Sequence, residues 1–459
     1  MIDTFAIRCS ILRLAFSGKL SEQTEADGTA EAILNRISPE KVISQTENVP
    51  YVIPDSWAWV RLADLYDINP RVEADGGQEA AFIPMERISG GFDRAFTYET
   101  QSWERASKNH TKFEDNDVAF AKITPCFENR KSFIAQNLPN SIGGGTTELI
   151  ILRQKEMLPE YTYYLILDQR FISTGTASYK GMVGQQRVQS DVIKNYLIPV
   201  APYAEQKRII QKIEQAFSDL DIVDELQAQY ADNLTALKAK LIDSAIQGKL
   251  TEQLPEDGTA EELYQQIQHE KQELVRAGKI KKDKPLPEIT EGEIPFDIPD
   301  NWKMCRLGSV ITLVSGTDYK PEEYNDENRG TPYITGASNL LPGGVLINRW
   351  TETPRCIANT GDVLLVCKGS GYGKVAMCDV EEAHIARQIM AVKKSDLLNM
   401  RYILYFLTAN FAYLKGKGQG LIPGVDRNSV LSMIFPLPPL KEQNRIVDKL
   451  DELTGLIEA

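Results

Sequence analysis

The chain carries an internal repeat, and self-similarity of this kind limits the possible folds more than any other sequence feature. The segment AFSGKLSEQTEADGTAE at residues 15–31 returns without a gap as AIQGKLTEQLPEDGTAE at residues 245–261. Two further blocks follow in the same order: IPDSW at 53–57 returns as IPDNW at 298–302, and IPVAPYAEQKRI at 198–209 returns as FPLPPLKEQNRI at 435–446. Three matched blocks predict two copies of one structural unit, related by a pseudo-twofold internal repeat.

Between the second and third blocks the two copies diverge. Both stretches are rich in β-branched and aromatic residues interrupted by Gly, Pro, Asn and Asp, which predicts strands and turns with a few helices, an α/β (α+β) fold. Each contains an Asp-Val pair followed by apolar residues, DVAF at 117–120 and DVLL at 362–365, and each of these predicted strands leads into a turn and a basic cluster. We therefore expect the two copies to share a backbone structure and to differ in the side chains at their surfaces.

A long helical pattern follows the first proline-containing block. From Glu205 to Gln247 apolar residues recur at steps of three and four, with charged residues between them. Pro202 before this stretch and Gly248 after it suit the two ends of a helix. Its 43 residues exceed the mean helix of about 11 residues, which favours a coiled coil over an ordinary amphipathic helix. We expect this to be a partner-binding helix, with the apolar positions Ile213, Phe217, Leu220, Tyr230, Leu234, Leu237 and Leu241.

The second copy of this helix is split between the two ends of the sequence. Residues 442–459 match its first part, and residues 1–17 match its last part. We therefore expect these segments to rebuild one helix, with the termini close together in a closed ring of repeats.

Composition gives a mixed signal about nucleic acid. The net charge of -13 and the pI near 5.0 argue mildly against a DNA-binding protein. Acidic residues, however, crowd the linker-like stretches, while the segment from Lys368 to Lys374 contains none, and the local field matters more than the net charge. The six cysteines form no C-x-x-C pair, and the start lacks the pattern of a signal peptide, which predicts a reduced, cytoplasmic location without disulfides or zinc.

No combination of residues predicts catalysis, a metal site or a bound cofactor. The loop from Gly369 to Lys374 resembles a phosphate-binding loop, but it has three residues instead of four before Gly-Lys, and Val375 replaces the Ser or Thr. A tight turn between strands is the better interpretation. Three scattered histidines are too few for a metal site or a proton relay, and no G-x-S-x-G motif is present.

Polar and basic loops after the predicted strands are the candidates for DNA contact. They combine Arg, Lys, Asn and Gln, which can read base edges, with Gly and Thr, which admit phosphates closely. Taken one at a time, each fits a surface turn equally well. In the first copy the candidates are Lys122, Thr124, Asn129, Arg130, Lys131, Thr146, Thr147, Gln185, Gln186 and Arg187. In the second copy they are Lys368, Ser370, Tyr372, Lys374, Arg387, Gln388, Lys417, Gln419, Arg427 and Asn428. Of these, Lys122 and Lys368 are expected to contact phosphates.

Two variable regions, each closed by a proline motif and a long helix, resemble the specificity subunits of type I restriction-modification systems. The motif reads PLPPLKEQNRI at 436–446, and the stretches FIPM at 82–85 and ITPCFEN at 123–129 are also similar to that family. The first proline motif departs from the pattern, because Ala201 and Tyr203 stand where Pro and Leu are expected. The likeness covers the whole chain.

The resemblance implies a non-catalytic subunit that recognises a bipartite DNA sequence. Two target recognition domains would be separated by an antiparallel helical coiled coil. Partners would be double-stranded DNA, two methyltransferase subunits that bring S-adenosylmethionine, and in some assemblies two motor-nuclease subunits with ATP; no membrane is implied. The corresponding domains are an N-terminal helical segment (1–50), the first recognition domain (51–200), a central helical region (201–292), the second recognition domain (293–440) and a C-terminal helix (441–459).

Three other functions stay open on the residues alone. A coiled-coil scaffold that binds only proteins would not need basic loops in both variable regions. An enzyme that binds ATP at the Gly369 loop would show nucleotide binding. A DNA-binding regulator that works without a methyltransferase is the alternative that the sequence excludes least well.

Overall fold

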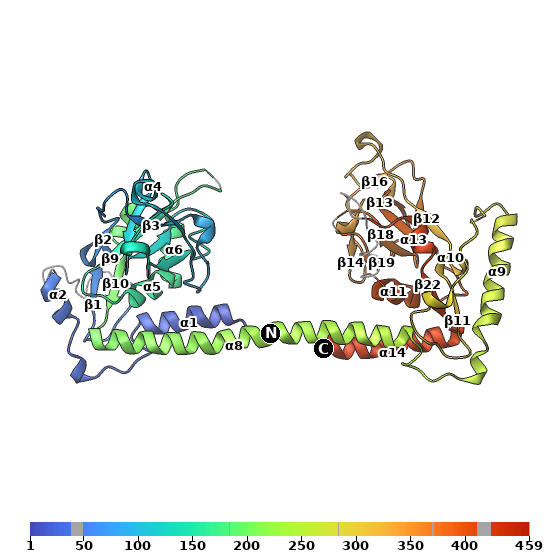
Figure 1. Cartoon of the computed structure of the whole chain (residues 1–459), viewed down its shortest axis with the longest axis horizontal. Helices are drawn as coiled ribbons and strands as arrows, with labels where there is room; N and C mark the ends of the chain where they lie inside the picture. Colours follow the sequence, from blue (N-terminus) through green and yellow to red (C-terminus); the bar gives the residue numbers. More distant parts are fainter. Residues whose placement is uncertain (38–48, 183, 283, 370, 411–423, 459) are drawn as a thin grey trace. The chain divides into compact units, whose positions relative to one another are not determined.

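The structure is a computed structural model that describes residues 1–37, 49–182, 184–282, 284–369, 371–410 and 424–458. It forms two compact units, Met1–Gln229 and Tyr230–Ala459 (Figure 1). The boundary falls within one helix of 44 residues, α8 (Tyr203–Ile246). The helix predicted over 205–247 is therefore present, and its observed ends lie within two residues of the predicted ones.

The first unit is built on two four-stranded sheets and a two-stranded ribbon, β1-β10. The strand orders of the sheets are β2-β9-β6-β7 and β4-β3-β8-β5. β3 and β8 run parallel, whereas the other pairs of these sheets are antiparallel. The strands are β1 (Ala58–Arg61), β2 (Tyr66–Ile68), β3 (Glu79–Ile83), β4 (Glu99–Ser102), β5 (Thr111–Glu114), β6 (Val118–Ala121), β7 (Ser132–Ile134), β8 (Ile142–Gly145), β9 (Leu149–Gln154) and β10 (Leu197–Val200).

The second unit repeats this topology strand for strand. Its sheets have the orders β12-β21-β18-β19 and β16-β13-β20-β17, its ribbon is β11-β22, and β13 and β20 form the parallel pair. A short hairpin, β14-β15, is added. The strands are β11 (Lys303–Arg306), β12 (Leu313–Ser315), β13 (Thr331–Ile334), β14 (Leu340–Leu341), β15 (Gly344–Val345), β16 (Trp350–Thr351), β17 (Ile357–Asn359), β18 (Val363–Val366), β19 (Val375–Met377), β20 (Glu382–Ile385), β21 (Ile389–Val392) and β22 (Ile434–Leu437). The duplication predicted from the sequence is thus a duplication of mixed α/β structure.

Helices cover these sheets in both units. In the first unit they are α1 (Thr4–Phe16), α2 (Glu31–Ile37), α3 (Leu62–Leu65), α4 (Trp103–Ser107), α5 (Pro159–Leu167), α6 (Gln169–Ala177) and α7 (Ser190–Lys194). In the second unit they are α9 (Ala260–Arg276), α10 (Leu307–Val310), α11 (Met400–Ala409), α13 (Arg427–Leu431) and α14 (Leu440–Glu458). Side-chain caps fix several starts: Asp168 accepts from the amide of Arg170 at α6, and Thr259 and Glu262 form a capping box at α9.

The predicted Asp-Val strands are the buried centres of their sheets. All four residues of β6 and of β18 are buried, which accounts for their uninterrupted apolar sequence. The aspartate before each strand is also buried, and it is neutralised by a cation from the neighbouring strand or its end. Arg153 donates to Asp117 at 2.8 and 2.7 Å, and the ammonium of Lys393 donates to Asp362. These pairs satisfy carboxylates that would otherwise be costly to bury.

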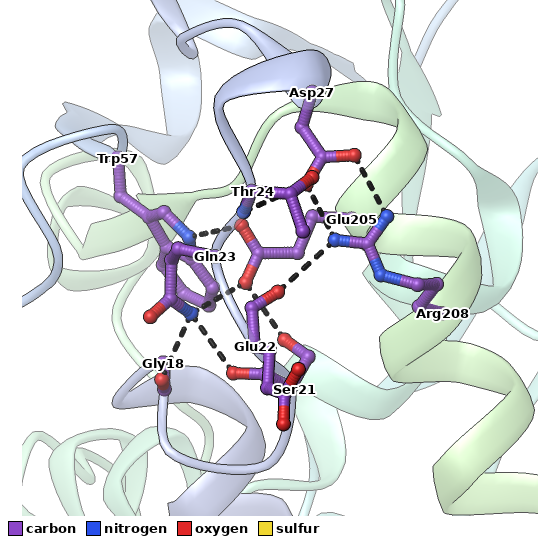
Figure 2. Close-up of polar contacts among 9 residues, drawn as sticks. All are labelled: Gly18, Ser21, Glu22, Gln23, Thr24, Asp27, Trp57, Glu205 and Arg208. Atoms are coloured by element: carbon purple, nitrogen blue, oxygen red, sulfur yellow. Dashed lines mark hydrogen bonds and ion pairs between the residues drawn. The ribbon is translucent and has the colours of Figure 1, made fainter.

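A buried glutamate at the start of the long helix ties the repeated blocks together (Figure 2). The Glu205 carboxylate accepts from Trp57 Nε1 at 2.8 Å, Ser21 Oγ at 2.7 Å and Gln23 Nε2 at 2.7 Å. One turn further along the same helix, Arg208 pairs with Asp27.

The second unit repeats this arrangement around Glu442. Its carboxylate accepts from Trp302 Nε1 at 2.9 Å, Gln253 Nε2 at 2.9 Å and Thr251 Oγ1 at 3.2 Å. The residues shared by the two sequence blocks are therefore structural: each set fastens its sheets to its helix.

The glycine of each GKL block is required by its backbone conformation and by close packing. Gly18 and Gly248 have φ of +70° and +71°, and a Cβ on either would lie within 2.5 Å of the ring of Pro54 or Pro299. A side chain at these positions would push the proline of the IPD block away.

Each unit pairs a shorter helix with its own part of α8 (Figure 1). In the first unit α1 runs antiparallel to α8: Ile2 bonds to Gln227, Thr4 Oγ1 donates to Asp224 at 2.6 Å, and Arg8 donates to Asp221 at 2.6 Å. In the second unit the apolar residues of α14 pack with the end of α8 in one core. Among the described helices none combines the length and the apolar character needed to cross a membrane.

Candidate nucleic-acid interface

The predicted loops of the first unit meet where β6 ends. The amide of Lys122 donates to the carbonyl of Glu148 at 2.8 Å, and its carbonyl accepts from Val188 at 2.9 Å. Two residues on, Thr124 donates to the carbonyl of Gln186 at 2.9 Å. Three segments far apart in the sequence, around residues 122–124, 146–148 and 185–187, are thus joined by backbone bonds into one surface.

An ion pair holds this surface. The guanidinium of Arg187 makes a bidentate contact with Glu148, at 2.9 Å from Nε and 2.7 Å from Nη2. This contact lowers the pKa of Glu148 and raises that of Arg187, because the hydrogen bonds and the charges both favour the ionised forms. Arg187 Nη1 donates to the carbonyl of Gln185 at 3.0 Å, and the Arg187 side chain is 43% exposed. A guanidinium fixed in this way is preorganised to bond a base edge or a phosphate.

The other candidates of the first unit lie around this surface with different exposures. Gln185, Thr147 and Asn129 are exposed, while Lys122, Thr124, Thr146 and Gln186 are half-buried. Lys131 is half-buried, and its ammonium donates to the carbonyl of Met85 at 2.9 Å.

The expectation that Arg130 contacts DNA is wrong. Its side chain is 6% exposed. The guanidinium donates to the carbonyl of Leu167 at 3.0 Å and to Gln169 at 2.6 Å, and it lies over the rings of Phe5 and Phe92. A buried arginine with these partners holds α1, the loop near residue 92 and the α5–α6 junction together.

The second unit brings its candidates to the equivalent place. The amide of Cys367 donates to the carbonyl of Gln388 at 2.7 Å, and its carbonyl accepts from Val425 at 2.8 Å, which is the pattern seen at Lys122. Lys368 is exposed beside this ladder. Its bridge to Gly424 corresponds to the bridge between Ile123 and Arg187 in the first unit.

The glycine loop that resembles a nucleotide-binding motif is a turn between β18 and β19. The ammonium of Lys374 donates to the carbonyl of Ala337 at 3.1 Å, so the lysine of the loop is used within the fold. Tyr372 packs against the main core of this unit. The loop therefore shapes the surface near Lys368, as a tight turn should.

The remaining candidates of the second unit fall into two groups. Arg387 is exposed and pairs with Asp318 at 3.1 Å, and the side-chain Nε2 of Gln388 donates to the carbonyl of Thr335. At the start of α13, Arg427 donates to the carbonyl of Leu313 at 2.6 Å, and Asn428 is exposed. The candidates outside the described residues are Ser370, Lys417 and Gln419.

Sequence reasoning missed the acidic side of this surface. Glu148 pairs with Arg187 and Asp318 pairs with Arg387, yet each acid lies far from its arginine in the sequence. No local pattern signals such pairs. Among the described residues no group of three or more His, Cys, Asp and Glu side chains is placed to hold a metal ion.

Comparison with known proteins identifies the family. The model of the type I restriction modification DNA specificity domain matches residues 54–229 and 299–459. The chain belongs to this family. Its two matches fall one in each unit, so each unit contains one copy of the specificity domain.

Similar proteins cover nearly the whole chain. The EcoAI and EcoEI specificity subunits of type I restriction enzymes from Escherichia coli are each 31% identical to it; both alignments cover 98% of this chain, and 90% and 89% of the two relatives. Among solved structures, a chain from work on assembly and conformational transition of the type I R-M system has a TM-score of 0.68 at 21% identity, covering 89% of this chain and 93% of that one. The HsdS subunit from Thermoanaerobacter tengcongensis has a TM-score of 0.53 at 21% identity, covering 90% and 93%. These two likenesses support the fold.

The apolar positions of the long helix divide between core and surface. Ile213 and Phe217 are 0% and 7% exposed and belong to the core of the first unit, so the expectation that they bind a partner is wrong. Phe217 packs against residues of the same chain: Arg8 of α1, Phe92 in a loop and Tyr164 of α5. Leu220, Leu234 and Leu241 are half-buried, whereas Tyr230 and Leu237 are 62% and 44% exposed.

Proposed function

We propose that this member of the specificity family recognises a bipartite double-stranded DNA sequence and positions methyltransferase subunits on it. Where the system has them, motor-nuclease subunits join the assembly. The recognition domains would be residues 51–200 and 293–440, joined by the helical regions 1–50, 201–292 and 441–459. The long helix α8 would separate them as one helix of an antiparallel coiled coil. Its exposed apolar residues would form the docking surface for the partner subunits.

One observation carries the proposal: the same backbone ladder displays two different polar sets. The bonds around Lys122 and around Cys367 match, but the side chains beside them differ, with Glu148 and Arg187 in one unit and Gln388 and Lys368 in the other. A protein that recognises two different half-sites needs two domains with the same backbone structure but different hydrogen-bonding side chains.

The chain would contribute no catalytic group, and S-adenosylmethionine and ATP would be held by the partners. It would act in the cytoplasm, where the DNA and the partner subunits meet. Purified full-length chain given S-adenosylmethionine and DNA is therefore expected to leave the DNA unmethylated. Methylation by the chain alone would contradict this proposal.

The decisive experiment is an exchange of one domain. The chain is co-expressed with its methyltransferase subunit in a host without other adenine methylation, and the methylated motif is read across the genome. Replacing residues 299–437 with the corresponding domain of a relative should change one half of the motif and leave the other half unchanged. Restoring the original domain is the control. A change in both halves, or a motif without two parts, would refute the proposal.

A further inference from the structure

The second unit contains a segment for which the first has no counterpart. In the first unit Pro54 lies 36 residues after Gly18, whereas in the second Pro299 lies 51 residues after Gly248, a difference of 15. The additional length falls between α9 and β11. It includes Lys279, Lys281, Lys282 and Lys284, and we call these four residues the lysine strap.

The lysine strap is held at both ends. Before it, Gln268 of α9 donates to the carbonyl of Ser309 in α10, and two residues after the end of α9 Gly278 has a φ of +68°. After it, Leu286 packs against the main core of the unit.

Arg306 fixes the segment that follows. Its guanidinium is bonded to the carbonyls of Pro287 and Glu288 at 3.1 and 2.9 Å and to the carboxylate of Glu293 at 2.9 Å. The equivalent Arg61 of the first unit bonds to a side chain of its own unit, Asn195, at the surface. The second unit thus uses a buried arginine to anchor an insertion that the first unit does not have.

The lysine strap borders a groove of about 890 Å³ on the surface of the second unit. The opposite wall comes from the outer edge of β12 and from α13. The residues that line the groove are Lys279, Ile280, Lys281, Lys282, Lys284, Pro285, Leu286, Pro287, Thr312, Leu313, Val314, Ser315, Arg427, Asn428, Leu431 and Ser432. Five of these described residues are cations and none is an aspartate or glutamate, which is unusual in a chain with 64 acidic and 51 basic residues. Asp283, between Lys282 and Lys284 in the sequence, lies outside the described residues.

The four ammonium groups are available for a ligand. All four lysines are exposed, and none of them forms an ion pair with a residue that the structure describes. Like charges held close together repel each other, and a bound polyanion relieves that repulsion.

We propose that the lysine strap binds the phosphate backbone of the DNA that the second unit recognises. The inference rests on the proposed function, because that function supplies a polyanion to this unit. Asn428, a candidate DNA contact at the start of α13, lines the same groove, so the strap extends that candidate surface. Lysines act on phosphates as flexible point charges and do not read bases. The strap therefore adds affinity without adding sequence preference, and it does so in one unit only.

The test compares two triple variants of the full-length chain. K281Q/K282Q/K284Q removes three charges from the strap, and the matched control K194Q/K207Q/K240Q removes three charges from exposed lysines elsewhere. Affinities for a duplex with the methylated motif and for one without it are measured between 50 and 200 mM salt. Each lost phosphate contact lowers the slope of log affinity against log salt by about 0.9. Raising the salt from 50 to 200 mM lowers the affinity of both proteins. The factor by which it lowers the affinity should be roughly 40-fold smaller for the strap variant than for the wild type.

The outcomes separate this inference from the function on which it rests. The strap variant should weaken binding to both duplexes by the same factor, while the control binds as the wild type does. If wild type selects its motif but the strap variant keeps the slope of the control, the strap does not contact DNA and the proposed function stands. Equal loss in both variants would overturn the inference in favour of a general charge effect. A wild type that binds neither duplex would refute both proposals.

Discussion

The ends of β6 and β18 are the most instructive pair of regions in this molecule. In each unit one residue after the strand donates to the loop after a parallel-paired strand and accepts from a segment near the proline motif. The residue is Lys122 in the first unit and Cys367 in the second, and the positions opposite it hold Glu148 and Gln388. The backbone bonds leave the side chains free to vary, so a duplicated frame can acquire two specificities without losing stability. The residues that hold each frame to its helix have changed little between the units, as the equivalent contacts of Glu205 and Glu442 show.

Of the substitutions predicted here, the removal of either buried glutamate should have the largest effect, a loss of stability in the unit that contains it. Glu205→Ala removes the acceptor of Trp57 Nε1 and of Ser21 Oγ, and Glu442→Ala removes the acceptor of Trp302 Nε1 and of Thr251 Oγ1. We expect each to destabilise its own unit by about 3–5 kcal/mol, because hydrogen bonds to a buried charge are costly to lose. Hydrogen–deuterium exchange of each unit, as a function of urea, measures this loss.

The effect should be somewhat larger for Glu205, because Ser21 lies closer to it than Thr251 does to Glu442. Glu225→Ala, at an exposed position of the same helix, is the control. Equal exchange in both units after Glu205→Ala would mean that the two units unfold together, and it would contradict the independence of the two cores.

The next effect concerns specificity at the equivalent positions. Glu148→Gln gives the first unit the residue of the second and frees Arg187 from its ion pair. Arg187→Ala and Arg387→Ala remove the guanidinium of one unit at a time. We expect each arginine substitution to cost roughly 1–3 kcal/mol of binding and to relax one base pair in one half-site. Glu148→Gln should change the preference at the position that Arg187→Ala relaxes.

The methylated motif of each variant, read genome-wide, checks these expectations. A motif that relaxes in both halves after a single substitution would show that the two frames do not read separately. Relaxation at different positions for Glu148→Gln and Arg187→Ala would show that the pair does not act as one reading element.

The repeat, the ends of the long helix and the buried strands could be predicted because short stretches of sequence are enough to recognise them. Pro202 and Gly248 bound the long helix within two residues of its observed ends, and the Asp-Val pairs precede buried strands in both units. The candidate surface was harder to predict, because its geometry depends on distant partners. Arg130 stands in a basic loop by sequence, yet Phe5 and Phe92 cover it. Ile213 and Phe217 continue the apolar stripe of α8, but only the packing of α1 and α5 shows that they face the core.

A smaller effect separates the two lysines at the ends of the central strands. Lys368 is exposed and Lys122 is half-buried, so Lys368→Gln should weaken DNA binding more than Lys122→Gln does. Each substitution should lower the salt slope by at most about 0.9 and leave the methylated motif unchanged, because phosphates carry no sequence information. Titration of each variant with duplex DNA at several salt concentrations gives the slopes. A relaxed motif for either variant would assign that lysine to a base instead.

The smallest predicted effect is a difference in stability between the two units at low pH. Arg208 lowers the pKa of Asp27, and Arg445 lowers that of Asp257, so these pairs act in the same direction in the two units. In the second unit Glu293 also has a lowered pKa, about 2, because it accepts from the backbone of Thr290 and from Arg306. Its folded pKa lies below the usual value of about 4.3, so the unfolded state binds more protons at pH 3. The stability it contributes is therefore present above pH 4.3 and is lost as the pH falls toward 2.

Hydrogen–deuterium exchange of residues 285–293 should accordingly rise between pH 4.5 and 2.5, after correction for the intrinsic exchange rate. Glu293→Gln should exchange faster at pH 5 and show a flatter dependence on pH. The segment around Asp27 serves as the internal comparison, because its carboxylate responds to the same acid in both proteins. If Glu293→Gln kept the pH dependence of the wild type, the anchoring of the insertion by Arg306 would not depend on this carboxylate, and the carbonyls of Pro287 and Glu288 would be sufficient to hold it.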